Sequence, residues 1–283
     1  MSICITSDST CDLSQAQLQA HGVELFPLRI LRDGEALQDG VEITPRDVFA
    51  HAAAGGSLCT TAALNPADYA GRFAELAAQH EAVIHINISA EFSPCHQNAV
   101  LAAADLPNVY VVDSRNLSTG HGLVVLAACQ MAESGQYGPA EIVARLESMI
   151  PRVSASFVLD QLEYMRRGGR CSSVVALGAN LLQLKPCIEV ADGKMHVGKK
   201  YRGSLLRCVS AYIRDRLARP EQLEPDRIFI THTVDYDPDV LAEAHRLVEG
   251  LGYFREVCDT EAGCTVSCHC GPGTLGILYV RKP

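Results

Sequence analysis

The chain has 283 residues, of which 48% are apolar and 20% are charged, and its formal net charge is −9. This composition is typical of a folded globular protein with room for two domains, and the excess of acidic residues argues against a general nucleic-acid binder. The longest apolar run, at 122–132, is shorter than the roughly eighteen residues of a membrane span, so we expect no transmembrane segment.

The beginning and the cysteines of the chain suggest a compartment. The segment MSICITSD lacks the basic and apolar stretches of a signal peptide. Twelve cysteines lie scattered among apolar residues, which is typical of reduced thiols in a core rather than of a disulfide framework. We therefore expect a cytoplasmic protein.

The first half alternates short strand-like runs with longer helical patterns, which predicts an open, mostly parallel sheet with flanking helices. The runs are ICITSD (3–8), VIHINI (83–88) and VYVVDS (109–114). Asn65 and Pro66 supply the N-cap and the first turn of a helix. Ligands of such sheets gather at loops that follow the carboxyl ends of strands. The loops of interest are 7–13, 59–65, 89–97 and 113–122.

From about residue 155 the pattern becomes that of a mixed α/β domain with hairpins, so we predict domains at 1–155 and 156–283. The predicted elements are a strand at 154–158, a helix ending at Gly168-Gly169, a hairpin at 187–201 that turns at Asp192-Gly193, a helix at 203–217, a strand at 228–233, a helix from Asp237-Pro238 to Gly250, and a final strand from 274.

Sequence motifs for catalysis and nucleotide binding are missing. The chain contains no GxSxG, HExxH or SxxK, and neither a Walker A loop nor a GxGxxG after its first strand. We therefore expect no catalytic residues, and if a kinase reaction is involved, another protein should supply the ATP.

The segment VSCHCGPGTLG (266–276) has two chemical interpretations. With Cys264, it offers Cys268, His269 and Cys270, which are the ligand types of zinc, although structural zinc sites usually draw cysteines from two groups. The simpler interpretation, and our expectation, is that the thiols lie on a buried strand and hold no metal.

Three short polar residues in turn-rich loops are candidates for an anion site: Thr61, Ser93 and His269. Each can donate a hydrogen bond to a carboxylate or a phosphate if the three converge. The alternatives are a solvated loop threonine and a serine that caps a helix.

Two basic segments stand out in this acidic chain, RRGGRCSS (166–173) and KKYRGSLLR (199–207). Arg170 and Arg202 each lie beside a glycine, where a partner can approach the backbone closely. The segments are either a docking surface for an acidic partner or a ligand phosphate, or a solvated surface with a helix end at Gly168-Gly169.

Taken together and in order, a series of motifs resembles the DegV family of bacterial fatty-acid-binding proteins. The motifs are SDSTCDL (7–13), TAALNPADY (61–69), ISAEFSPCHQNA (88–99), VVDSRNLSTGHG (111–122), LEYMRRGGR (162–170), KYRG (200–203) and CHCGPGTLG (268–276). The resemblance spans nearly the whole chain.

The resemblance implies two α/β domains with a long-chain fatty acid buried between them as ligand, and no cofactor. It implies a binding subunit without turnover of its own, which presents the carboxylate to a separate ATP-binding fatty acid kinase subunit. That subunit makes an acyl-phosphate for phospholipid synthesis. By position, Thr61, Ser93 and His269 match the residues that bind the carboxylate, and Arg170 and Arg202 match arginines at the kinase-facing mouth.

The chain departs from the family pattern in two loops. The usual Thr-Ser-Gln-Pro-Ser-Pro run is TAALNP at 61–66, and Pro94 replaces a glycine after Ser93. We expect Phe92, Cys95 and His96 to line the pocket. An alternative function is that of the substrate-binding subunit of a dihydroxyacetone-kinase-like system, which holds a small carbonyl compound on a histidine.

Overall fold

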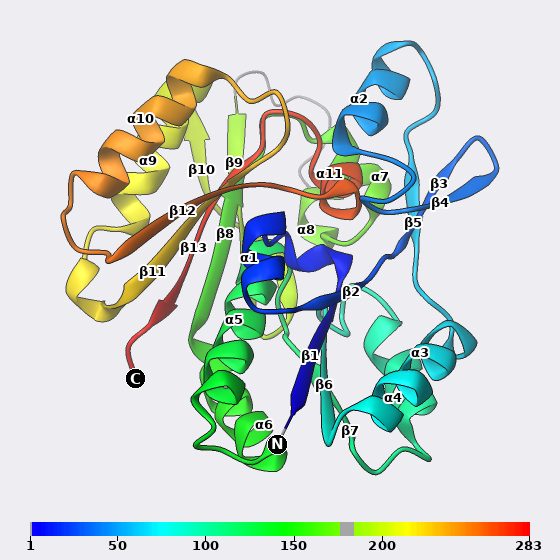
Figure 1. The fold of residues 1–283 in the computed structure, drawn as a ribbon. Coiled ribbons are helices and arrows are strands. Elements are labelled where there is room, and N and C mark those ends of the chain that lie inside the picture. The colour runs from blue at the N-terminus through cyan, green and yellow to red at the C-terminus, as the bar shows by residue number, and fades with distance from the viewer. Residues whose placement is uncertain (1, 176–183) are drawn as a thin grey trace.

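The computed structural model describes residues 2–175 and 184–283, whose strands form three sheets (Figure 1). The first sheet is parallel and has the order β2-β1-β6-β7, with β1 at Ile3–Asp8, β2 at Glu24–Phe26, β6 at Ala82–Asn87 and β7 at Val109–Asp113. One face packs against α3 (Pro66–Gln79) and α4 (Cys95–Ala103), and the other against α5 (Ser118–Ser134) and α6 (Pro139–Met149). The predicted parallel sheet is thus confirmed.

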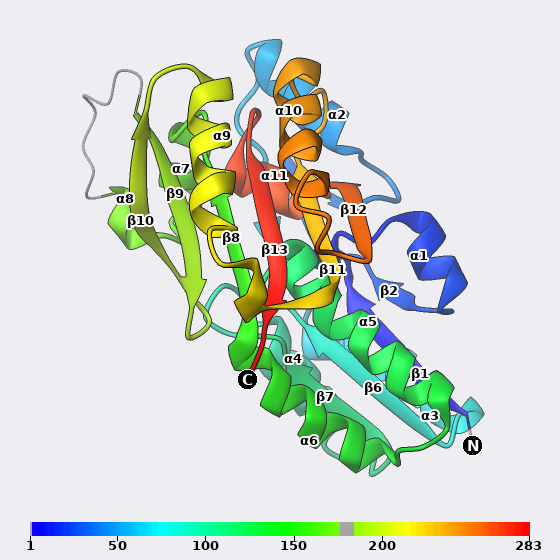
Figure 2. The same ribbon diagram turned by 90° about the vertical axis from the view of Figure 1, so that its left-hand side faces the viewer.

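The second sheet has six strands of mixed direction, in the order β10-β9-β8-β13-β11-β12. Its strands are β8 (Val153–Val158), β9 (Leu184–Ala191), β10 (Lys194–Arg202), β11 (Leu223–His232), β12 (Glu256–Glu261) and β13 (Leu275–Arg281). The helices α9 (Leu205–Arg216) and α10 (Pro238–Glu249) cover its outer face (Figure 2). The mixed α/β class predicted for this half is confirmed, as is the hairpin turn at Asp192-Gly193.

The third sheet, β4-β3-β5, lies outside every sequence prediction. It contains β3 (Arg29–Arg32), β4 (Glu35–Gln38) and β5 (Thr60–Ala62), and α2 (Pro45–Ala53) joins β4 to β5. These strands have three or four residues each, which is too short for an alternating pattern to be recognised. The remaining short elements are α1 (Gln15–Ala20), α7 (Glu163–Gly168), α8 (Ser172–Val175), α11 (Cys264–Cys270) and the 3-10 turns Ser9–Cys11, Ile150–Arg152 and Pro220–Gln222.

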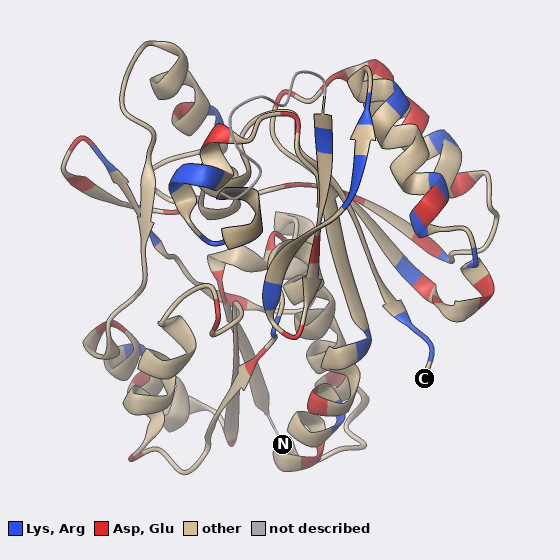
Figure 3. Cartoon of the chain, turned by 180° about the vertical axis from the view of Figure 1, so that it is seen from behind, with Lys and Arg blue, Asp and Glu red and all other residues tan. Residues whose placement is uncertain are grey.

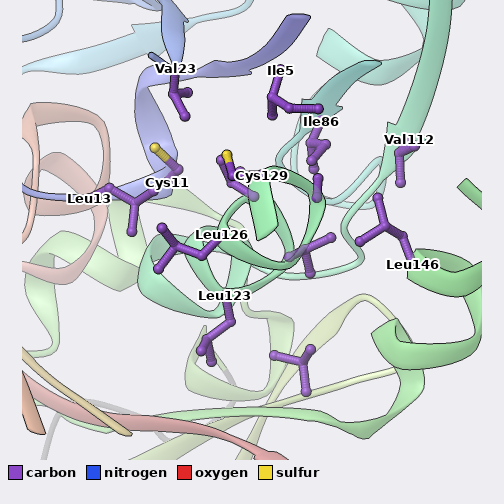
Figure 4. Close-up of a cluster of buried hydrophobic side chains, with 14 of the residues drawn as sticks. Ile5, Cys11, Leu13, Val23, Ile86, Val112, Leu123, Leu126, Cys129 and Leu146 are labelled. Carbon is purple, nitrogen blue, oxygen red and sulfur yellow. The ribbon is translucent and has the colours of Figure 1, made fainter. Parts of the chain in front are cut away.

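Helix α5 lies between the parallel and the mixed sheet and joins them into one core (Figure 4). Its residues Leu123, Leu126 and Cys129 are buried with Ile86 of the parallel sheet and Leu278 of the mixed sheet. Residues 122–126 of this helix are all buried, which explains why the first part of the run at 122–132 is apolar on every side, whereas Gln130 is exposed. No helix within 2–175 or 184–283 is long and apolar enough to span a bilayer.

The segment 264–270 differs from its prediction. We expected the thiols of this segment on a buried strand, but the structure forms the short helix α11 there, which ends at Gly271 with a positive φ of 74°. The helix packs on α7, α2 and the three-stranded sheet (Figure 1).

Candidate functional site

A cavity of about 250 Å³ lies where β5, α7, β10 and α11 meet the loop that follows β6. Most of its wall is apolar and belongs to the buried core, including Ile88, Phe92, Leu117, Met165 and Val266. Its polar lining consists of the side chains of Thr61, Ser93, Arg170, Thr265 and His269. The structure thus brings the three anion-site candidates together around one apolar cavity.

Thr61 and His269 are joined by a hydrogen bond of 2.8 Å between Thr61 Oγ1 and His269 Nε2. Thr61 lies on β5 and His269 on the last turn of α11, so the bond links segments far apart in sequence. Burial, with a smaller contribution from the positive charge of Arg170, lowers the pKa of His269 to about 4. The imidazole is therefore neutral at pH 7 and carries one N–H.

Gly168 fixes the other side of this ring. A Cβ at Gly168 would lie 2.3 Å from His269 Nδ1, and Nδ1 is buried without a hydrogen-bond partner in the described part of the chain. Gly168 is the last residue of α7, and the predicted helix end is confirmed, with Gly169 as a left-handed C-cap at a φ of 68°. The α7 terminus and β5 hold the imidazole between them.

Ser93 lines the cavity and precedes α4, whose N-cap is Pro94 and not this serine. Its Oγ accepts a bond of 3.3 Å from the backbone N–H of Cys95 at the start of α4 and donates one of 3.0 Å to Cys95 Sγ. Because the thiol is a weak acceptor, little is lost when the hydroxyl turns toward another oxygen. Ser93 therefore helps to start α4 and still offers a donor to the cavity.

The loop after Ser93 contributes less to the cavity than we expected. Phe92 lines it, but neither Cys95 nor His96 is among the described lining residues. Cys95 is fully buried beneath the loop with Tyr69 and Phe73. The first turn of α4 directs the thiol into the core because the helix packs against α3 there.

The two arginines differ in position. Arg170 lines the cavity, and its Nη1 donates a bond of 2.6 Å to the carbonyl oxygen of Gly168. Arg202 ends β10, is exposed and is absent from the described lining. Figure 3 shows Lys and Arg gathered on α7 and on the end of β10. Both arginines are thus exposed, and of the two only Arg170 lines the cavity.

The cysteines around His269 lie in two different environments. Cys264 and Cys268 are buried with Cys59 against the three-stranded sheet, whereas Cys270 lines the cavity. Burial raises the pKa of all three α11 thiols, so they are protonated at neutral pH. Within 2–175 and 184–283 no three His, Cys, Asp or Glu side chains group as metal ligands.

Sequence reasoning missed Thr265, Met165 and Met195 as lining residues. Thr265 precedes His269 by four residues and therefore shares its face of a helix. That relation follows only once the segment is known to be helical. The methionines carry no sequence signal, since a methionine on an apolar face is usually core.

The comparisons with known proteins agree with this architecture. The family model described as "Uncharacterised protein, DegV family" matches residues 2–282. A DegV domain-containing protein of Deinococcus radiodurans is 32% identical over 280 residues, which cover 98% of each chain.

Solved structures show the same fold. One is described as "Fatty Acid Binding of a DegV family Protein from Thermus thermophilus" and aligns with a TM-score of 0.91 at 30% identity over 100% of both chains. Another, of DegV, a fatty acid binding protein from Bacillus subtilis, aligns with a TM-score of 0.88 at 24% identity, also over 100% of both.

Proposed function

The chain belongs to the DegV family, and on that premise we propose that it binds a long-chain fatty acid in the cavity lined by Thr61, Ser93 and His269. The proposal rests on one observation: a single cavity has a mostly apolar wall and is also lined by these three neutral hydrogen-bonding groups. The relative from Thermus thermophilus, described as binding fatty acid, supports the same ligand class.

The apolar wall accounts for affinity. Each methylene removed from water contributes about 0.8 kcal/mol before the costs of ordering the chain. A long acyl chain therefore binds tightly with few polar contacts. The polar residues then determine which end of the ligand lies at the α11 end of the cavity.

The head-group residues are donors without charge. The Ser93 hydroxyl can donate to a carboxylate oxygen, and the Thr61 hydroxyl can do so in the tautomer in which His269 Nε2–H donates to Thr61 Oγ1, so that the neutral ring orients the Thr61 donor. Neutral donors hold the carboxylate but leave its oxygen more nucleophilic than a full ion pair would. Such an oxygen can attack a γ-phosphate that a partner brings in line.

We further propose that a separate ATP-binding kinase subunit performs this phosphorylation. The acyl-phosphate would then serve phospholipid synthesis. Arg170 at the cavity and Arg202 on the surface are suited to meet the transferred phosphate and the partner, respectively. The chain itself would act as a carrier without turnover and without a cofactor, and the partner's use of ATP makes the cytoplasm the proposed compartment.

The alternative of a dihydroxyacetone-kinase-like subunit is not favoured. A small, polar carbonyl compound would need mostly polar walls, because its hydroxyl groups lose hydrogen bonds when buried against apolar side chains. The cavity wall has the opposite character.

Thr61→Val tests the head-group assignment. The two side chains have the same shape, so the substitution removes the hydroxyl bonded to His269 and leaves the cavity volume nearly unchanged. We expect the affinity of the delipidated protein for hexadecanoate to fall about tenfold, or about 1.4 kcal/mol, in calorimetric titrations. Thr44→Val, at the exposed N-cap of α2, is the control. Unchanged affinity in Thr61→Val would remove Thr61 from the site.

A further inference from the structure

The helix that carries His269 is too short to hold its own position. Helix α11 has seven residues, and helices of this length are unstable without tertiary contacts. The backbone N–H groups at its start also lack partners within the helix. Residues outside α11 must therefore bind its first backbone N–H groups and so determine where the helix begins.

Two aspartate side chains from the first part of the chain accept hydrogen bonds at that point, although burial raises the pKa of Asp12 to about 8, so this side chain is largely protonated at pH 7. Gly263 N donates to Asp12 Oδ1 at 2.9 Å, while Cys264 N and Thr265 N donate to Asp39 Oδ1 and Oδ2 at 3.0 and 3.1 Å. The oxygens of both side chains satisfy backbone N–H groups that the helix itself leaves without partners. The contacts span more than two hundred residues of sequence, as the separation of 225 between Asp39 and Cys264 shows.

Burial and several hydrogen bonds hold the Asp39 side chain in one position. Its side chain is 4% exposed, and Oδ2 also accepts bonds from Thr265 Oγ1 at 2.6 Å and from Ser9 Oγ at 2.9 Å. Ser9 belongs to the SDSTCDL segment, as does Asp12, whose Oδ2 accepts a 2.5 Å bond from Ser118 Oγ. The segment contributes no side chain to the cavity lining in the described part of the chain; in this region Asp12 contacts the start of α11, and Ser9 contacts Asp39.

We propose that Asp39 is a positioning residue for the head-group site: it fixes the start of α11 so that His269, five residues after Cys264, reaches Thr61. The effect on ligand binding rests on the proposed function. The position of the imidazole does not, because the Thr61–His269 bond joins two side chains of the chain itself.

Asp39→Asn is the direct test. The substitution keeps the shape of the side chain but replaces one oxygen, which accepts bonds, with an amide N–H₂, which faces donors that it cannot satisfy. The control is Asp237→Asn, because Asp237, the exposed N-cap of α10, also accepts bonds at a helix start, from Asp239 N at 2.9 Å and Val240 N at 3.2 Å. Both variants change a carboxylate that accepts bonds from backbone N–H groups at a helix start, but only Asp39 contacts the helix that carries His269.

Two measurements separate positioning from general damage. The first is the ¹⁵N NMR spectrum of the His269 side chain in delipidated protein, which reports the bond to Thr61. The second is a double-mutant cycle in which Asp39→Asn and His269→Ala are combined and hexadecanoate affinity is titrated. If Asp39 acts through His269, its effect disappears once the imidazole is gone.

We expect Asp39→Asn to change the His269 signals and to weaken hexadecanoate binding about tenfold. Asp237→Asn should change neither the signals nor the affinity. The double variant Asp39→Asn with His269→Ala should bind hexadecanoate like His269→Ala alone. Wild-type His269 signals in Asp39→Asn, or an undiminished effect in the His269→Ala background, would overturn the inference. If Asp39→Asn does not fold, Ser9→Ala, which removes one donor to Asp39, should shift the same signals to a smaller extent, and unshifted signals would overturn it equally. Wild-type protein that fails to bind fatty acid would instead refute the proposed function and leave the NMR result intact.

Discussion

The imidazole of His269 occupies its position only because residue 168 is a glycine and has no side chain. Because a Cβ would lie 2.3 Å from His269 Nδ1, Gly168→Ala should push the ring away from Thr61. We expect fatty-acid affinity to fall about tenfold, which corresponds to about 1.4 kcal/mol.

Gly71→Ala is the matched control for this substitution. Gly71 lies inside α3, and an added Cβ there would meet no atom within 4 Å. Alanine should stabilise that helix by about 0.5–1 kcal/mol and leave binding unchanged. Equal affinities for Gly168→Ala and the wild-type protein would show that the ring tolerates displacement.

The buried imidazole of His269 should make the protein sensitive to acid. Its pKa of about 4 in the folded state lies below the ordinary value of 6.5, so the unfolded chain binds the proton first as the pH falls. The stabilisation is complete above pH 6.5 and is lost between pH 6.5 and 4. Between pH 7 and 5 this single group should cost about 2 kcal/mol of unfolding free energy.

Urea denaturation of delipidated protein at both pH values measures this effect. His269→Gln cannot be protonated at this position, so its stability should fall by about 2 kcal/mol less than that of the wild-type protein over the same interval. Parallel pH dependence in the two proteins would contradict the burial of a neutral ring.

Among the elements, the β9–β10 hairpin connects the two halves of the cavity wall. At its tip, Gly193 has a φ of 79° and its carbonyl oxygen accepts a 2.8 Å bond from Ser89 Oγ. Lys194 Nζ lies 3.6 Å from Glu91 Oε2, and the next residue, Met195, lines the cavity. The hairpin therefore closes the cavity from the side of the mixed sheet.

Gly193→Ala should loosen this closure, because alanine is strained at that φ and its Cβ would lie 2.9 Å from Ser89 Oγ. We expect fatty acid to dissociate several-fold faster and the hairpin amides to exchange hydrogen faster. The control is Gly34→Ala in the Asp33-Gly34 turn between β3 and β4, where φ is 89° and no atom lies within 4 Å. Equal dissociation rates in the two variants would mean that the hairpin tip does not retain the ligand.

The elements also show where sequence reasoning succeeds. The parallel strands, the Asp192-Gly193 hairpin and the helices capped by Asn65 and Asp237 were predictable, because their apolar runs, turn residues and caps are local. The three-stranded sheet was not, because its strands are too short for a pattern. Helix α11 depends on contacts with Asp12 and Asp39, which no local rule can anticipate.

The candidate site depended on the resemblance more than on local pattern. Thr61, Ser93 and His269 are each unremarkable in their own segments, and nothing in their spacing brings them together. The structure joins Thr61 to His269 and gathers all three at one cavity. Cys95 was wrongly expected to line the pocket, because its position in the sequence does not reveal that the first turn of α4 directs its side chain into the core.

At the scale of the whole molecule, the proposed carrier role requires that ligand binding and partner recognition be separable. Arg202→Ala should leave fatty acid bound, because the residue is exposed and lies outside the described cavity lining. Phosphorylation by the proposed kinase subunit should fall at least tenfold if this arginine contacts it.

The control for this surface is Arg145→Ala. Arg145 lies on α6, at the opposite end of the molecule from α7, and pairs with Glu141 (Figure 1). Its loss should affect neither binding nor phosphorylation. Loss of lipid from Arg202→Ala would show that this arginine belongs to the ligand pocket. Normal phosphorylation of the variant would show that the arginine is not part of the docking surface.

The central claim is that this chain carries a fatty acid, and native mass spectrometry of the protein as purified tests it most directly. The account predicts a complex whose excess mass is released on denaturation and is identified as one long-chain fatty acid per chain. The same measurement on Thr61→Val should give partial occupancy. Wild-type protein that stays free of lipid even after incubation with hexadecanoate and octadecenoate would contradict the account.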